Sequence, residues 1–250
     1  MPDINTKLIL ICGKSASGKS FSFKNIPDQK HWWFLNTEAG KALPYRNKFD
    51  SYTIVNPYDV IGALAQGTDN PDCHGIIVDS LTFLMDMFES TQVLAPGADT
   101  RKQWGNYQQF FKTMLQNKVP LFNKPVIFTA HIQEIYDEKT MDWKTSVPIK
   151  GALKGNGVEA YFNQIVYAKK VPVKKLENYQ NDLLHITEDE KEVGYKHVFQ
   201  TRITPDALDE KIRGPYDMFS KKETYIDNDV NQLLKRIDEY YADDDAVTAA

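Results

Sequence analysis

The segment Gly13-Lys14-Ser15-Ala16-Ser17-Gly18-Lys19-Ser20 is a complete G-x-x-x-x-G-K-[ST] loop. In such a loop the glycines let backbone N–H groups turn inward around a polyphosphate. The lysine, Lys19, reaches the terminal phosphates, and the hydroxyl of Ser20 ligates Mg²⁺. The sequence therefore predicts that residues 13–20 bind ATP together with Mg²⁺.

The residues on either side of this loop supply the context that the motif requires. Residues 7–12 are a short apolar run of the kind that forms a buried strand. Residues 20–26 are expected to form the first helix, which Pro27 ends. The alternative, a Gly/Ser-rich turn with an unrelated lysine, does not account for this strand–loop–helix order.

The rest of the chain alternates between expected strands and helices. This alternation indicates an α/β fold, a mostly parallel twisted sheet with helices on both faces, as in P-loop NTPases. Residues 133–150 are expected to be a hairpin or a flexible loop. Buried strands are expected at 31–36, 51–55, 75–79, 125–130, 164–168 and 196–201, and helices at 58–66, 81–93, 104–116, 151–161 and from about 228 to 241.

Composition narrows the class of protein. A chain of 250 residues with 42% hydrophobic content can build one large core, so we expect a single domain over 1–241 with a polar insertion near 174–193. The acidic segment 242–250 is expected to be disordered, as a solubilising or a docking tail. Cys12 and Cys73 are expected to be reduced packing residues. No signal peptide or membrane-length apolar run is evident, so a cytoplasmic protein without membrane contact is expected.

Three polar residues follow apolar strands and are candidates for catalysis. Asp79 ends the run 75–79 and is the expected Mg²⁺-side carboxylate, with a helix N-cap as the alternative role. Glu38 follows the strand 31–36 and is expected either to orient the attacking water or to be an ordinary exposed loop acid. His131 follows the strand 125–130 as a polar phosphate sensor or a structural histidine. In an open sheet the carboxyl ends of strands form the ligand crevice, so these side chains should converge.

The order of these motifs resembles the RecA/RadA recombinase core. The matching segments are the loop 13–20, Asn-Thr-Glu-Ala-Gly at 36–40, Ile-Ile-Val-Asp-Ser at 76–80 and Val-Ile-Phe-Thr-Ala-His-Ile at 126–132. The chain looks closest to the small phage-encoded RecA-like ATPases of single-strand annealing and recombination. The resemblance implies that Glu38 activates water, Asp79 assists Mg²⁺ and His131 senses the γ-phosphate. It departs from the family in having His131 where glutamine is usual, and in showing no separate DNA-binding domain.

The resemblance also implies single-stranded DNA as a partner, bound by two mobile loops. The net charge of −4 excludes coating of nucleic acid by charge alone, so such a site must be local or shared between subunits. Cations mixed with aromatic residues suit single strands, although the aromatic residues could instead pack beneath the loops. The candidates are Arg101, Lys102 and Trp104 in the segment 94–104, and Tyr136, Lys139, Trp143, Lys144 and Lys150 in 133–150.

ATPases of this class often complete the site with a cation from a neighbouring subunit. The candidates here are Arg202, Lys211 and Arg213, with surface pairing to Asp206, Asp209 and Glu210 as the alternative. The overall expectation is an ATP- and Mg²⁺-dependent, DNA-stimulated ATPase that forms a ring or filament. Its location would be the host cytoplasm if it is phage-encoded. A P-loop kinase for a small molecule and a nucleotide-switched assembly protein without turnover remain the rival predictions.

Overall fold

An eight-stranded sheet forms the centre of the computed structural model, which describes residues 5–139 and 141–248. The strand order is β10-β9-β8-β1-β5-β4-β2-β3. The strands from β8 to β3 run parallel, whereas β9 and β10 are antiparallel to their neighbours and form one edge. The predicted α/β architecture with a mostly parallel sheet is therefore confirmed. The strands are β1 (Leu8–Gly13), β2 (Trp32–Asn36), β3 (Asp50–Thr53), β4 (Gly75–Asp79), β5 (Val126–His131), β8 (Gln164–Pro172), β9 (Tyr195–Gln200) and β10 (Tyr225–Asp227).

The central strands β1, β4 and β5 are buried along almost their whole length. Strands that are covered on both faces need apolar side chains on both faces, which is why they are continuous apolar runs in the sequence. Leu10 and Cys12 of β1 enter the core on one face, and Ile9 and Ile11 enter the core on the other. Cys12 and Cys73 are buried free thiols, as their expected packing role requires.

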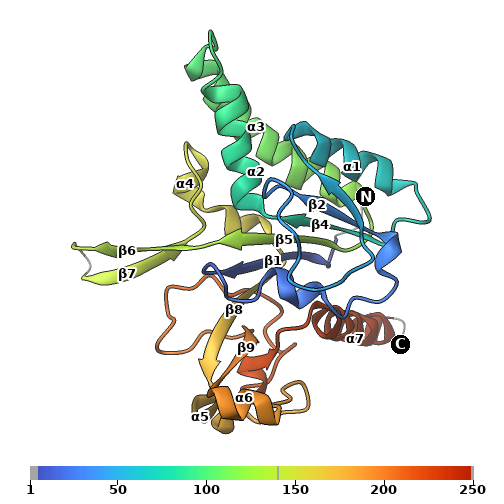
Figure 1. Cartoon of the computed structure of the whole chain (residues 1–250), viewed down its shortest axis with the longest axis vertical. Helices are drawn as coiled ribbons and strands as arrows, with labels where there is room; N and C mark the ends of the chain where they lie inside the picture. Colours follow the sequence, from blue (N-terminus) through green and yellow to red (C-terminus); the bar gives the residue numbers. More distant parts are fainter. Residues whose placement is uncertain (1–4, 140, 249–250) are drawn as a thin grey trace.

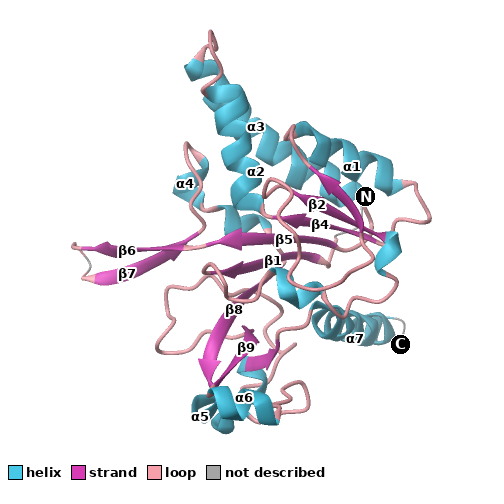
Figure 2. Cartoon of the chain, viewed as in Figure 1, coloured by secondary structure: helices cyan, strands magenta, loops and turns pink. Residues whose placement is uncertain are grey.

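Helices cover both faces of the sheet (Figures 1 and 2). One face carries α1 (Tyr58–Thr68), α2 (Leu81–Phe88) and α3 (Thr100–Lys112), and the other carries α7 (Val230–Thr248). The short helices α4 (Leu153–Asn156), α5 (Val173–Leu176) and α6 (Glu188–Val193) lie in connections. Further helical turns are of the 3₁₀ type (Ser20–Phe23, Gln29–His31, Val119–Leu121, Val158–Tyr161, Glu177–Tyr179, Lys222–Thr224) or the π type (Glu89–Val93, Thr113–Lys118).

A two-stranded hairpin projects from the carboxyl edge of the sheet, at the left of Figure 1. Its strands, β6 (Gln133–Asp137) and β7 (Asp142–Ser146), pair antiparallel and form a sheet of their own. Of the two forms expected for 133–150, the hairpin is the one found. Because β6 begins two residues after the end of β5, the hairpin is a direct extension of the central sheet.

Several boundaries differ from the sequence-based expectation for local physical reasons. The helix expected at 20–26 is only the 3₁₀ turn Ser20–Phe23, because Pro27, four residues after Phe23, leaves too little chain for an α-helix. The expected loop ends before residue 103. The Asp99 side chain accepts a hydrogen bond from Lys102 N and caps α3, which therefore begins at Thr100. These residues are helical rather than part of a mobile loop.

The C-terminal half also holds structure that the sequence did not indicate. The polar insertion 174–193 contains α5 and α6, and β10 was not expected at all. The segment 242–250, expected to be disordered, is helical as far as Thr248, where α7 ends. Residues 249 and 250 lie outside the described part of the chain.

Candidate nucleotide-binding site

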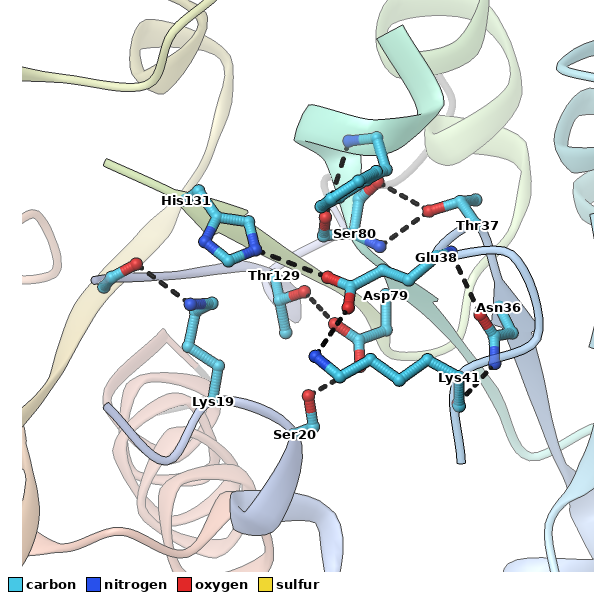
Figure 3. Close-up of polar contacts among 12 residues, drawn as sticks. Lys19, Ser20, Asn36, Thr37, Glu38, Lys41, Asp79, Ser80, Thr129 and His131 are labelled. Atoms are coloured by element: carbon cyan, nitrogen blue, oxygen red, sulfur yellow. Dashed lines mark hydrogen bonds and ion pairs between the residues drawn. The ribbon is translucent and has the colours of Figure 1, made fainter. Parts of the chain in front are cut away.

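The candidate site lies at the carboxyl edge of the parallel sheet. The register of β1 and β5 places Gly13 beside His131. The loop 13–20 leaves β1 here and borders a cavity of about 430 Å³. Glu38, Asp79 and His131 line the same cavity (Figure 3). The structure therefore brings together the three side chains that the sequence placed at separate strand ends.

The phosphate-binding loop is closed around its own lysine. Lys19 Nζ donates hydrogen bonds of 2.9 Å to the carbonyl oxygens of Gly13 and Lys14. The side chain is buried, and this burial lowers the pKa of the ammonium group. Bound phosphate would offer Lys19 charged acceptors in place of neutral carbonyls, and such hydrogen bonds are roughly twice as strong. Ala16 and Gly18 have positive φ angles of 58° and 99°, which give the loop its tight curve.

Ser20 and Asp79 form the pair expected on the metal side. Ser20 Oγ donates a hydrogen bond of 2.7 Å to Asp79 Oδ2, and Thr129 Oγ1 donates to Asp79 Oδ1. Burial raises the pKa of the Asp79 carboxyl, and the two hydroxyl donors oppose that rise. The alternative role of Asp79 as a helix cap is wrong, because Ser80 Oγ accepts from Phe83 N at the start of α2.

Glu38 is held with its carboxylate inside the site. Glu38 Oε1 lies 3.4 Å from His131 Nε2, and Glu38 Oε2 accepts a hydrogen bond of 3.1 Å from Lys41 Nζ. The His131 contact, assisted by Lys41, lowers the pKa of Glu38 to about 2. The backbone N–H of Glu38 donates to Asn36 Oδ1 over 2.9 Å, which fixes the turn after β2. With only 10% of its side chain exposed, Glu38 is not an ordinary exposed loop acid.

His131 is fixed from two further directions. Its backbone N–H donates to Thr82 Oγ1 over 2.9 Å, and its ring meets the ring of Phe83 edge to face at 5.7 Å. The imidazole is thereby held between α2 and Glu38 (Figure 3). This placement allows both roles that the sequence left open, a polar sensor and a structural contact.

The donor set fits Mg²⁺ and a triphosphate. Mg²⁺ prefers oxygen ligands and is usually bound through one or two carboxylates together with phosphate oxygens. Ser20 and Asp79 supply two such oxygens side by side, next to the phosphate donor Lys19. Within the described ranges, no group of three or more His, Cys, Asp or Glu side chains could hold a metal, so an ion here needs further oxygens from phosphate or water.

Four residues of the site were not expected from the sequence. Thr129 gave a weak signal, since it is the one hydroxyl residue in the apolar run 126–130. Lys41 lies three residues after Glu38 and was not singled out, whereas His197 and Asn228 gave no signal because only the fold brings them to the loop. His197 Nδ1 lies 2.9 Å from a loop carbonyl, and Asn228 Nδ2 donates to another over 2.8 Å.

The first set of DNA candidates does not form a loop. Arg101 and Lys102 lie exposed in the first turn of α3. Trp104 packs against the main core and meets the Tyr107 ring at 5.2 Å, which is the packing role weighed as the alternative. The start of α3 and the β6–β7 hairpin point away from the sheet in different directions (Figure 1).

The second set of DNA candidates lies mostly on the hairpin. Tyr136 and Trp143 face each other across the two strands with ring centroids 5.4 Å apart, and Lys139 lies exposed in the turn. Lys144 pairs with Asp137 on the same hairpin. Lys150 lies outside the hairpin and pairs with Glu89 at 2.7 Å. Of these three lysines, Lys139 alone makes no ion pair with a carboxylate of residues 5–139 and 141–248, so the hairpin turn is the better-placed part of the set.

None of the three candidate trans-acting cations lines the cavity of its own chain. Arg202 donates to the carbonyl oxygens of Tyr216 and Phe219, and Arg213 donates to that of Ala160. Lys211 Nζ lies 3.4 Å from Asp209 Oδ1, and Lys169 and Lys175 pair with Glu210 and Asp206. The surface pairing weighed as an alternative thus applies to Lys211 and not to the two arginines.

The sheet order, the loop 13–20 and the Ser20–Asp79 pair define a P-loop nucleoside triphosphatase. A family model described as an AAA domain matches residues 5–207, and the chain belongs to this family of P-loop ATPases. No curated protein matches the chain. Membership in the family indicates nucleotide-dependent ATPase activity, typically with Mg²⁺.

In residues 5–139 and 141–248, none of the helices has the length and apolar character that crossing a bilayer demands.

Proposed function

We propose that this chain is a RecA-like ATPase that hydrolyses ATP with Mg²⁺ and binds single-stranded DNA as an oligomer, in recombination, annealing or replication. The observation that carries the proposal is the convergence of Lys19, Asp79 and Glu38 on one cavity. A phosphate donor, a metal-side carboxylate and a buried carboxylate for water are the groups that hydrolysis requires. The position of Glu38 after the second strand favours hydrolysis over transfer to a small molecule.

The residues of the site have separate tasks in this proposal. The loop amides and Lys19 bind the β- and γ-phosphates, and Ser20 with Asp79 would hold Mg²⁺. The bound ion would supply positive charge against the charge that develops on the phosphates. Glu38 has a pKa of about 2, so its carboxylate is a weak base. It is too weak to remove a proton outright but can orient a water molecule. His131, adjacent to Glu38, is placed to donate to a γ-phosphate oxygen.

Single-stranded DNA is assigned to the β6–β7 hairpin. Exposed rings suit stacking on bases, and Trp143 and Tyr136 are 58% and 44% exposed. Lys139 in the turn adds a cation for the phosphate backbone. The hairpin also adjoins the nucleotide site, since Glu134 of β6 forms a 2.7 Å ion pair with Lys14 of the phosphate loop.

The composition of the cavity supports oligomerisation into a ring or filament. The described residues that line the cavity include no arginine, so one chain does not supply an arginine to its own site. Arg202 and Arg213 are held on the surface by carbonyl groups rather than carboxylates. In this proposal one of them, or Lys211, serves the cavity of a neighbouring copy, where a cation stabilises the charge of the transferring phosphoryl group.

One experiment separates this function from its rivals. Phosphate release from ATP is measured with and without single-stranded oligonucleotide, together with the mass of the complex. We expect turnover that rises on DNA addition, and loss of that rise in a Lys139/Trp143/Lys144 triple alanine variant. Turnover without any response to DNA would contradict the DNA assignment. Binding of ATP without turnover would instead favour a nucleotide-switched assembly protein.

A further inference from the structure

Two side chains from distant parts of the chain hold the phosphate loop from its outer side. His197 Nδ1, on β9, lies 2.9 Å from the carbonyl oxygen of Ser17. Asn228 Nδ2, between β10 and α7, donates a hydrogen bond of 2.8 Å to the carbonyl oxygen of Gly18. A carbonyl oxygen only accepts hydrogen bonds, so Nδ1 of His197 carries the hydrogen.

Holding these carbonyls also fixes two N–H groups. A peptide unit is planar and trans, so its C=O and N–H groups point in opposite directions. The contact of His197 with the Ser17 carbonyl therefore sets the direction of the Gly18 N–H. In the same way, the contact of Asn228 with the Gly18 carbonyl sets the Lys19 N–H. These two amides belong to the segment whose N–H groups cradle phosphates in a loop of this type.

The two donors lie so close to Gly18 that they explain why this position of the motif is a glycine in this chain. Gly18 has a φ of +99°, and a Cβ atom there would lie 2.7 Å from Asn228 Nδ2 and 2.9 Å from His197 Nδ1. Real Cβ atoms do not approach neighbours so closely. Any side chain at position 18 would push both donors away, so the glycine and the two donors fit one another.

The two donors are themselves anchored. His197 pairs with Lys170 in the β8–β9 ladder. Directly after Asn228, Asp229 accepts a 2.8 Å hydrogen bond from Asn25, and Val230 is buried in the core beneath the sheet. The backbone that carries each donor is therefore tied to the sheet or to the core, as holding a loop in place requires.

We propose that His197 and Asn228 are positioning residues that hold the Gly18 and Lys19 amides ready for phosphate. Asn228 lies beyond residue 207, where the AAA domain match ends. The connection between β10 and α7 is therefore part of the nucleotide site. This inference rests on the proposed nucleotide binding at residues 13–20.

The test uses full-length protein and two ligands, Mg²⁺–ATP and inorganic tripolyphosphate, with affinities measured by calorimetry. We expect His197→Ala and Asn228→Ala to weaken both ligands on the order of fivefold to tenfold, the usual effect of one lost hydrogen bond. Asn228→Asp should weaken them further, because it sets an anionic oxygen against the Gly18 carbonyl. In turnover assays KM should rise while kcat stays within about twofold, since held amides bind ground state and transition state alike.

Rescue separates positioning from mere packing. His197→Asn places an amide donor where Nδ1 lies and should stay within about twofold of wild type. Asn25→Ala is the matched control, since it cuts the neighbouring tie to Asp229 without touching a loop carbonyl, and it should leave both affinities unchanged. If Asn228→Ala does not fold in a thermal melt, Asn228→Ser replaces it.

The outcomes are distinct. Wild-type affinity in both alanine variants, while wild-type protein binds both ligands, overturns the positioning role and leaves the proposed nucleotide site intact. Equal losses in His197→Asn and His197→Ala also overturn it, because the donor position would then be irrelevant. Failure of the wild-type protein to bind either ligand overturns the proposed function together with this inference.

Discussion

The nucleotide edge of the sheet and the β6–β7 hairpin are built in opposite ways. At the edge, polar groups are buried and satisfied by one another, as Asp79 is by Ser20 and Thr129. On the hairpin, large side chains face solvent, with Met141 78% and Trp143 58% exposed. In the first region polar side chains pair largely with one another, whereas the second presents large exposed side chains, as the proposed contact with a partner requires.

This difference between buried and exposed side chains decides how much of each region's function the contacts within one chain can indicate. Buried polar groups are costly unless paired, so each partner at the edge constrains the chemistry of the next. An isolated two-stranded hairpin is only marginally stable in water. The function of the hairpin is therefore argued from the partner that it is proposed to bind. The two regions nevertheless meet, because β5 ends at His131 and β6 begins at Gln133.

The largest effect is expected at the edge. Glu38→Gln keeps the size of the side chain but removes the charge that orients water, and kcat should fall on the order of 10²–10³-fold. Affinity for ATP should change less than about threefold, because Glu38 is not a phosphate donor. Phosphate release and equilibrium ATP binding measure the two quantities. Unchanged kcat would move water activation to another residue and weaken the hydrolytic assignment.

A smaller effect is expected at Thr129, which donates a hydrogen bond to the metal-side carboxylate of Asp79. Thr129→Val preserves shape but leaves Asp79 Oδ1 buried without its hydroxyl donor. The free energy of unfolding should fall by about 1–3 kcal/mol, measured by urea titration. Thr53→Val on the exposed strand β3 is the control, and it should stay within about 0.5 kcal/mol of wild type. Equal effects at the two positions would remove the contrast between buried and exposed polar groups.

On the hairpin, we expect a substitution to change binding strongly and stability little. Trp143→Ala should weaken binding of a fluorescent oligothymidine roughly tenfold, since base stacking contributes about 1–3 kcal/mol. Its free energy of unfolding should change little because the ring is exposed. Tyr52→Ala removes an exposed aromatic from the edge strand β3, outside the hairpin; it is the control and should bind as wild type. Retained DNA affinity in Trp143→Ala would leave the hairpin for another partner.

Much of the edge could be predicted from the sequence, because each group follows directly from a local pattern. The loop 13–20 is a contiguous motif, and Glu38, Asp79 and His131 each stand at the end of an apolar run. Parallel strands end at one edge, so local positions were enough to predict that these residues meet.

The remainder depended on contacts between distant residues. His197 and Asn228 reach the site only through packing that no local pattern encodes. The same holds for the engagement of two DNA candidates, since Trp104 packs against the core and Lys150 pairs with Glu89 across the fold. The sequence predicted candidate residues for the site, but not which cations and rings are already engaged within the chain.

The smallest expected effect is a pH dependence of stability set by Glu38. Its pKa of about 2 in the folded protein lies below the ordinary glutamate value of 4.5, so the stabilisation is present above pH 4.5 and is lost as pH falls toward 2. We expect roughly 1 kcal/mol from this group, since the cavity admits solvent that screens the His131 and Lys41 contacts. Urea titrations of wild type and Glu38→Gln at pH 7 and pH 3 measure it. Wild type should lose more stability than the variant, and parallel losses would mean that the contacts with His131 and Lys41 do not hold the carboxylate.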